Sequence, residues 1–217
     1  MTSPIGVKIC GLSTPDMVDV AVDAGATHIG FMFFERSPRN VTAAQAAELR
    51  ALVPAGVQAV AIVVNPDDAL VDEIVQTVKP DLLQLHGSET PERVTAIKTR
   101  TGLPVMKVIS VADAADVATA DIYEKVADLL LFDAKPPKSM ANALPGGNAV
   151  SFDWSLIADA EPQLPWMLSG GLTPDNVADA IARTGARMVD VSSGVEDAPG
   201  QKNEALIRAF VKAAQSA

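Results

Sequence analysis

The sequence has little cysteine, a deficit of basic residues and no long apolar run. Its single cysteine, Cys10, excludes an intramolecular disulfide and a metal site built from clustered cysteines. With 17 Lys and Arg against 27 Asp and Glu, the net charge of −10 argues against nonspecific nucleic-acid binding, which needs a basic face. No segment is apolar for long enough to span a membrane, and the N-terminus lacks the basic and apolar regions of a signal peptide. We therefore expect a cytoplasmic protein that binds neither nucleic acid nor membrane.

The composition is that of a folded chain. Hydrophobic residues make up 48% of the 217 residues, whereas disordered chains combine low hydrophobicity with high net charge. This length supports a core that needs no covalent staples. We expect a single domain over residues 1–217, and a monomer because no long exposed apolar stripe is evident.

Eight short apolar runs alternate with amphipathic stretches along the chain. Runs without polar interruptions are typical of parallel strands that are covered on both faces. The predicted strands are Val7–Cys10, Ile29–Phe34, Ala59–Val64, Leu82–Leu85, Val105–Ile109, Leu129–Phe132, Trp166–Leu168 and Met188–Val191. The clearest predicted helices are Asp16–Ala24, Ala43–Leu52, Asp68–Val78, Glu92–Arg100, Asp175–Arg183 and Asn203–Ala214, and those after the fifth and sixth strands are the least distinct.

A repeated tripeptide supports the same organisation. In each copy a capping residue, a proline and an acid predict the start of a helix. The copies are Thr14-Pro15-Asp16, Asn65-Pro66-Asp67, Thr90-Pro91-Glu92 and Thr173-Pro174-Asp175. Their spacing fits multiples of a unit of roughly 27 residues, the length of a strand, a helix and two loops. Eight such units predict an α/β fold, a (β/α)8 TIM barrel with a parallel eight-stranded core. The alternative is a doubly wound open sheet, but the turn after Cys10 lacks the glycine-rich fingerprint typical of that fold.

Two reactive groups end predicted strands, where barrel enzymes place their chemistry. Cys10 ends the first strand beside Lys8, and a thiol titrates close enough to neutrality to serve as a base. Asp133 ends the sixth strand after an apolar run that favours a protonated carboxyl, hence a general acid. The alternatives are a buried structural cysteine for Cys10, and for Asp133 either a solvated loop carboxylate or an ion-pair partner of Lys135. A base and an acid across one barrel mouth suit an isomerase that moves protons and needs no cofactor.

Glycine and serine follow the last two strands, where barrels commonly bind phosphate. Glycines allow backbone N–H groups to approach phosphate oxygens, and serines add hydroxyl donors. The candidate phosphate ligands are Gly170, Gly171, Ser192, Ser193 and Gly194. Tight turns are the alternative explanation for each loop alone, but both loops together favour a phosphosugar substrate.

Further polar residues are expected around the mouth. Arg39, together with Arg36, offers a guanidinium for a carboxylate or phosphate, with surface solvation as the alternative. Gln84 and His86 follow the fourth strand and are candidates for substrate contact. Asp190 is expected to hold the neighbouring loop backbone or to orient a substrate hydroxyl. No His, Asp or Glu group has the spacing of metal ligands, so no metal is expected.

At these residues the chain resembles the phosphoribosylanthranilate isomerases of tryptophan biosynthesis. The resemblance covers nearly the whole chain, and its two most specific segments are Lys8–Gly11 and Asp190–Glu196. It implies an Amadori rearrangement of N-(5-phosphoribosyl)anthranilate to 1-(2-carboxyphenylamino)-1-deoxyribulose 5-phosphate. It further implies that Asp133 is the general acid, Cys10 the general base and Arg39 the anthranilate ligand, with the two glycine loops holding the phosphate.

One loop departs from the family pattern. Residues 134–151 are long for a barrel connection and are expected to form a mobile lid. Within them Ala149 stands where the family typically has a glycine, and we expect only a modest effect on loop conformation. The alternative functions are the aminoaldose isomerase of histidine biosynthesis, which is expected to use two aspartates, and a non-catalytic phosphosugar-binding barrel.

Overall fold

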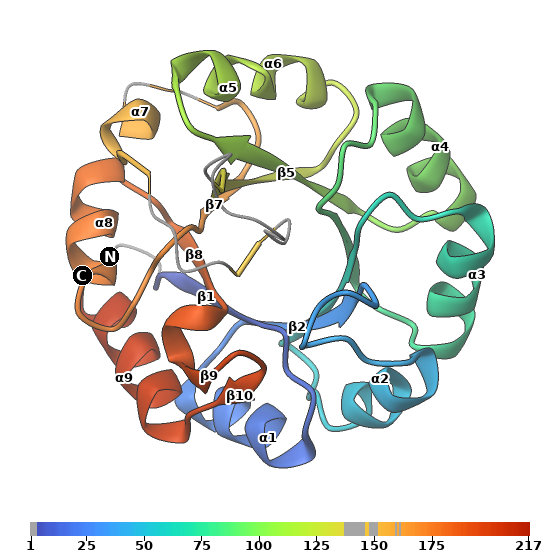
Figure 1. The fold of residues 1–217 in the computed structure, drawn as a ribbon, viewed down its shortest axis with the longest axis horizontal. Helices are drawn as coiled ribbons and strands as arrows, with labels where there is room; N and C mark the ends of the chain where they lie inside the picture. Colours follow the sequence, from blue (N-terminus) through green and yellow to red (C-terminus); the bar gives the residue numbers. More distant parts are fainter. Residues whose placement is uncertain (1–3, 137–145, 148–151, 159, 161) are drawn as a thin grey trace.

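Eight parallel strands close into a barrel, as the apolar runs predict (Figure 1). The computed structural model describes residues 4–136, 146–147, 152–158, 160 and 162–217. The strands pair in chain order, and β1 pairs with β8 to close the ring. The strands are β1 (Gly6–Cys10), β2 (His28–Phe33), β3 (Gln58–Val63), β4 (Leu82–Leu85), β5 (Val105–Val111), β6 (Leu129–Ala134), β7 (Trp166–Leu168) and β8 (Met188–Val191). The closed ring confirms the predicted barrel and excludes the open sheet.

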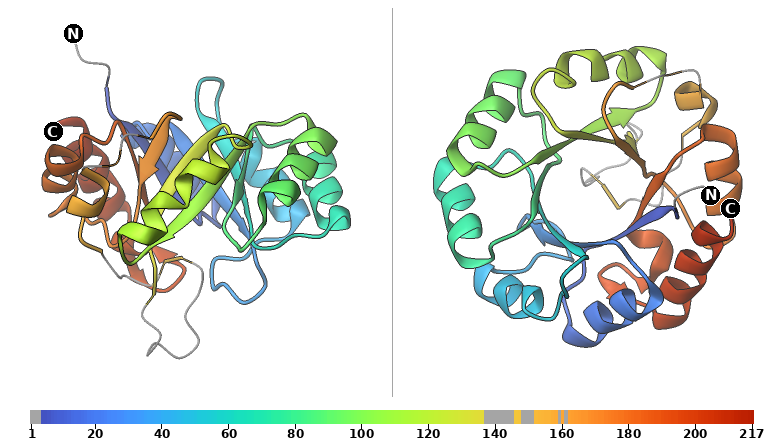
Figure 2. Two further views of the ribbon diagram at one scale, coloured as in Figure 1. Left: turned by 90° about the horizontal axis from the view of Figure 1, so that it is seen from above. Right: turned by 180° about the vertical axis from the view of Figure 1, so that it is seen from behind.

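Helices surround the strands, which cross the molecule obliquely inside them (Figure 2). They are α1 (Pro15–Ala24), α2 (Ala43–Arg50), α3 (Asp68–Thr77), α4 (Pro91–Thr101), α5 (Ala114–Ala118), α6 (Ala120–Tyr123), α7 (Ser155–Ala158), α8 (Val177–Thr184) and α9 (Glu204–Gln215). The segments after β5 and β6 are the short helices α5, α6 and α7, which explains their weak sequence signal. No helix in the described ranges is long and apolar enough to cross a membrane.

The repeated tripeptide predicts helix starts with mixed success. Thr90 caps α4 as predicted, because its side chain accepts a hydrogen bond from the Arg93 N–H. Thr14 occupies the N-cap of α1 without a side-chain bond. The predictions at Asn65 and Thr173 are wrong: α3 is capped by Asp67, two residues after Asn65, and α8 begins only at Val177. A proline is compatible with a position before a helix as well as with its first residue. Here Pro174 lies in a turn before α8, and Pro66 lies in irregular backbone before α3.

Strand alternation divides the core into two layers. One layer packs between the sheet and the helices. The other fills the barrel interior with Cys10, Val60, Ile62, Leu82, Met106, Val108, Leu131 and Met167. Because side chains alternate across a strand, every second residue from these also faces inward. That rule points Lys8, Gln84, Asp133, Ser169 and Asp190 into the barrel, toward one end.

A small hairpin follows the last barrel strand and was not predicted from the sequence. A single 3₁₀ turn, Ser193–Val195, leads into β9 (Glu196–Ala198), which pairs antiparallel with β10 (Gln201–Lys202). The turn at Gly200 approaches the loop after β2 so closely that an added Cβ would lie 2.7 Å from the Pro38 carbonyl oxygen. The hairpin therefore packs against the loop that carries Arg39.

Candidate active site

Cys10 is the C-terminal residue of β1, and its side chain faces the barrel interior near buried charged groups. Its side chain is buried, and Lys8, two residues earlier on the same strand face, is fully buried. The Lys8 ammonium donates to Asp190 Oδ1 at 2.8 Å, an ion pair that joins β1 to β8. Burial raises the pKa of the Cys10 thiol, and the Lys8 ammonium offsets only part of that effect. Burial also lowers the pKa of Lys8, but Asp190 and Cys10 outweigh it, so that Lys8 keeps its charge.

Asp133 is part of a buried hydrogen-bonded chain at the end of β6. Its Oδ2 lies 3.2 Å from His86 Nε2, and its Oδ1 accepts from the Ala134 N–H at 3.0 Å. The other ring nitrogen of His86 lies 3.1 Å from Gln84 Nε2. Since the Gln84 amide nitrogen is a donor, His86 Nδ1 accepts and Nε2–H donates to Asp133. Asp133 therefore makes no pair with Lys135, which contacts Asp116 instead.

The three residues of this chain differ in their access to the mouth. His86 and Asp133 are buried at the barrel end, whereas Gln84 lies deeper and is fully buried. The Gln84 Oε1 atom has no hydrogen-bond partner among the described residues. The structure thus gives Gln84 a contact with His86, and its predicted contact with substrate stays a prediction.

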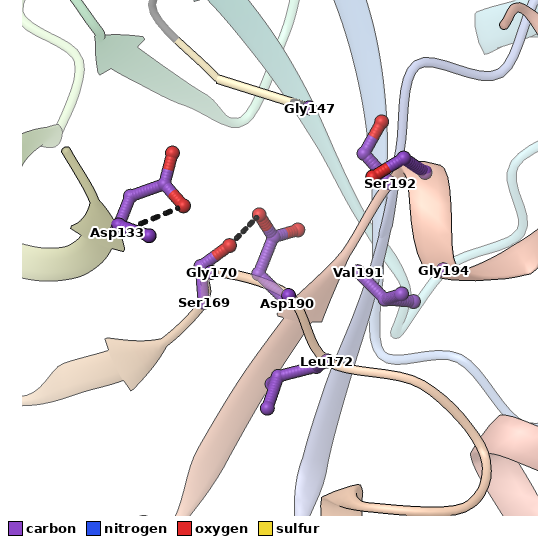
Figure 3. Close-up of a pocket in the computed structure, with 12 residues that line it drawn as sticks. Asp133, Gly147, Ser169, Gly170, Leu172, Asp190, Val191, Ser192 and Gly194 are labelled. Atoms are coloured by element: carbon purple, nitrogen blue, oxygen red, sulfur yellow. Dashed lines mark hydrogen bonds between the residues drawn. The ribbon is translucent and has the colours of Figure 1, made fainter. Parts of the chain in front are cut away.

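Asp190 contacts two side chains among the described residues. Its Oδ1 pairs with Lys8 and its Oδ2 accepts from the Ser169 hydroxyl at 3.3 Å. Its expected contact with loop backbone or with a substrate hydroxyl stays a prediction. Figure 3 shows the Ser169 and Asp190 side chains pointing toward one another beside the pocket. The sequence analysis missed Lys8 as a site residue, although its position two residues before Cys10 places both on one strand face.

The two glycine loops line one pocket together with Asp133, as the barrel pattern predicts. Gly170 and Gly171 have φ of 89° and 66°, and a Cβ on Gly170 would lie 2.7 Å from the Ala134 nitrogen. Only glycine fits both the backbone and the space at Gly170. In the part of the chain that the structure describes, the N–H groups of Gly171, Ser193 and Gly194 have no hydrogen-bond acceptor. The residues that carry these donors line the pocket, which therefore suits an anion.

Arg39 is buried and held by a carboxylate that the sequence analysis did not single out. Its Nε and Nη2 donate to the two oxygens of Glu196, each at 2.7 Å. Arg36, expected to assist it, is exposed and lies over the ring of Phe34, with the guanidinium carbon 6.0 Å from the ring centroid. Of the predicted arginine pair, the structure brings only Arg39 to the mouth.

Two glycines of the long connection after β6 touch these groups. A Cβ on Gly146 would lie 2.7 Å from His86 Cε1 and 2.9 Å from Asp133 Oδ2. Gly147 has a φ of 72° and lies against Arg39, whose Nη2 is 3.4 Å from its carbonyl oxygen. Residues 137–145 and 148–151 of the expected lid, including Ala149, lie outside the described residues. Among those residues, no group of three His, Cys, Asp or Glu side chains is arranged to hold a metal ion.

Comparison with known proteins identifies the family. A family model for N-(5'phosphoribosyl)anthranilate isomerase matches residues 7–213. The chain belongs to this family. Relatives named N-(5'-phosphoribosyl)anthranilate isomerase include one from Parvibaculum lavamentivorans, 58% identical over 98% of this chain and 99% of the relative. Another, from Brucella canis, is 53% identical over 98% of this chain and 95% of the relative.

Solved structures of the family share the barrel. Phosphoribosyl anthranilate isomerase from Thermotoga maritima is 33% identical with a TM-score of 0.88, covering 98% of this chain and all of the other. A second structure has 31% identity and a TM-score of 0.85, and the match covers 98% of this chain and 100% of the other. It is a complex of phosphoribosyl anthranilate isomerase with reduced 1-(o-carboxyphenylamino)-1-deoxyribulose 5-phosphate. A third describes monomers generated from the dimeric Thermotoga maritima isomerase, at 32% identity and a TM-score of 0.84 over 98% and 100% of the two chains. Dimers thus occur in the family, and the monomer expected here stays a prediction.

Proposed function

We propose that this isomerase rearranges N-(5-phosphoribosyl)anthranilate to 1-(2-carboxyphenylamino)-1-deoxyribulose 5-phosphate, the third step of tryptophan biosynthesis from anthranilate, with Cys10 as base and Asp133 as acid. The family match over residues 7–213 supports the reaction. The observation that carries the roles is that β1 and β6 aim a thiol and a carboxyl into one mouth beside two glycine loops. The same match favours this reaction over the histidine-pathway isomerase.

Asp133 is suited to open the sugar ring. The protonated carboxyl gives its proton to the ring oxygen while the bond from that oxygen to C1′ breaks. The amine nitrogen supplies the electron pair that forms the C=N bond of a Schiff base. The carboxylate left behind is stabilised by the donors already aimed at it, from the Ala134 N–H and His86 Nε2.

Cys10 is suited to the second proton transfer. Its thiolate takes the proton from C2′, the C–H electron pair forms the C1′=C2′ double bond, and the C=N electron pair returns to nitrogen. The resulting enolamine tautomerises to the ketone. A thiolate in this buried position needs a nearby cation, and Lys8 supplies one. Both steps only add or remove protons on one substrate molecule. The carbon skeleton and the overall oxidation state of the substrate therefore do not change.

The two anionic ends of the substrate have matching groups in the mouth. Arg39 is proposed to bind the anthranilate carboxylate through the guanidinium edge that Glu196 leaves free. Gly170, Gly171, Ser192, Ser193 and Gly194 are proposed to hold the phosphate. The buried side chains of Asp190 and His86 are proposed to contact the sugar hydroxyls between these two ends.

The proposal is tested by following the loss of phosphoribosylanthranilate fluorescence, with the substrate generated in situ. Wild type, Cys10→Ala and Asp133→Asn are compared without added metal or nucleotide. We expect turnover by wild type and a loss of at least about a hundredfold in each variant, since general acid–base groups contribute this much. Turnover that survives Cys10→Ala would assign the base elsewhere, and a folded but inactive wild type would exclude the reaction.

A further inference from the structure

Lys202 is a buried cation that reaches two parts of the mouth at once. It lies on β10, outside the eight barrel strands, and its side chain is 2% exposed. Its ammonium donates to Glu196 Oε1 at 2.6 Å and to the Ser192 carbonyl oxygen at 2.8 Å. Neither the family motifs nor the strand-end rule singles out this lysine. A buried charge with such partners is costly to assemble, so its position calls for an explanation.

Glu196 connects Lys202 to the arginine of the mouth. Its Oε1 accepts from both Lys202 Nζ and Arg39 Nε, and its Oε2 accepts from Arg39 Nη2 and the Gly200 N–H. Without Lys202, the carboxylate would cancel the charge of Arg39. With it, two cations share one carboxylate, and the cluster keeps one positive charge for an anionic ligand.

Ser192 connects the same ammonium to the glycine loop after β8. The Ser192 carbonyl that Lys202 holds shares a peptide unit with the Ser193 N–H, and the Gly194 N–H belongs to the next unit. Both N–H groups have no acceptor among the described residues. The Ser192 hydroxyl also donates to the Cys10 carbonyl oxygen at 3.3 Å. Fixing this carbonyl therefore helps to orient the backbone donors of residues that line the pocket.

We propose that Lys202 is a positioning residue that holds both anion subsites, the arginine for the carboxylate through Glu196 and the phosphate loop through Ser192. It touches neither end of the substrate itself. The ligand class is a molecule with a carboxylate at one end and a phosphate at the other, and this inference rests on the proposed function for the identity of that molecule.

The test compares Lys202→Met with Lys212→Met, which removes an exposed lysine of α9 as the matched control. KM and kcat are measured with phosphoribosylanthranilate, and binding of anthranilate and of inorganic phosphate is measured separately by calorimetry. We expect Lys202→Met to raise KM at least tenfold with kcat changed less than threefold, and to weaken binding of both probes. Lys212→Met should match wild type. A KM within twofold of wild type, or weakening of one probe alone, would overturn the proposal.

A double variant keeps the test decisive if Lys202→Met folds poorly. Lys202→Met with Glu196→Gln removes both charges of the pair, so that no carboxylate is left to cancel Arg39. We expect anthranilate binding to return to within threefold of wild type, while phosphate binding stays weakened because Ser192 has lost its donor. Recovery of both probes, or of neither, would refute the two-subsite role. Because the binding assays need no turnover, an inactive wild type would refute the proposed function separately.

Discussion

Replacing Gly194 with alanine should damage the pocket by steric contact alone. A Cβ at this position would lie 1.8 Å from the Leu172 carbonyl oxygen and 3.2 Å from Val191 Cγ2. Gly194 has no positive φ, so the backbone itself tolerates a side chain. The obstacle is that the loops after β7 and β8 interlock at this glycine, and the atom in the way belongs to backbone that cannot swing aside.

The size of the effect follows from that geometry. Ordinary contact begins at 3.4 Å, so the Leu172 carbonyl must retreat by 1.6 Å, the difference from 1.8 Å, or Gly194 must move by as much. Overpacking of this kind costs roughly 1–3 kcal/mol of stability. A shift of about 1 Å in positioning groups can cost a hundredfold in rate. We expect KM for phosphoribosylanthranilate to rise at least about tenfold, which corresponds to about 1.4 kcal/mol.

Gly185→Ala is the matched control. Gly185 has a φ of 70° and open space around it, at the C-terminal end of α8 and away from the mouth. Its replacement strains the backbone by roughly 1–2 kcal/mol and should lower Tm without changing KM. Steady-state kinetics and thermal unfolding of both variants give the comparison. If Gly194→Ala keeps KM within twofold of wild type, the interlocked loops do not set the pocket geometry.

Three further predictions concern charge. In Asp133→Asn the pH dependence of kcat/KM should report the Cys10 base alone. Because burial raises the pKa of Cys10, the residual kcat/KM should rise about tenfold per pH unit across neutrality. A plateau from pH 7 would contradict this. Lys8→Met should lower the free energy of unfolding by about 3–5 kcal/mol, because it leaves Asp190 buried and without its cation. Chemical denaturation of the double variant Lys8→Met with Asp190→Asn should show most of the lost stability restored. Equal losses in the single and double variants would refute the pairing. Burial lowers the pKa of His28 from 6.5 to about 4, so the folded state resists protonation of this side chain. About 3 kcal/mol of the free energy of unfolding is therefore fully present above pH 6.5 and is lost as pH falls toward 4. His28→Gln should flatten that part of the stability profile relative to wild type, and identical profiles would exclude the effect.

Much of the barrel could be predicted because parallel strands buried on both faces leave a plain sequence signal. The runs at Leu82–Leu85, Trp166–Leu168 and Met188–Val191 match β4, β7 and β8 residue for residue. Helix starts were harder, since Pro66 and Pro174 fit a turn as well as a first helical position. The short helices α5 to α7 could not be read, because four or five residues carry no helical period.

The site was predictable where strand ends carry chemistry, and less so where distant residues meet. Cys10 is the last residue of β1 and Asp133 the second-to-last residue of β6, and the structure brings both to the mouth that the sequence indicates. The contacts of Arg39 with Glu196 and of Lys8 with Asp190 join residues 157 and 182 positions apart. No local pattern reports such a pair, because it exists only once the first and last strands have met.

The pairing of β1 with β8 has a consequence for when the molecule becomes competent. The thiol of Cys10 comes from the first strand, while the carboxylate that keeps Lys8 charged beside it comes from the last. Until the final strand is in place, Lys8 has no Asp190, and the buried ion pair beside the proposed base does not exist. A partly assembled chain would thus carry the reactive atom without the buried lysine–aspartate pair that lies beside it in the complete barrel. Isomerase activity therefore requires the closed barrel. A fragment that lacks β8 should have no isomerase activity even where its remaining strands are formed.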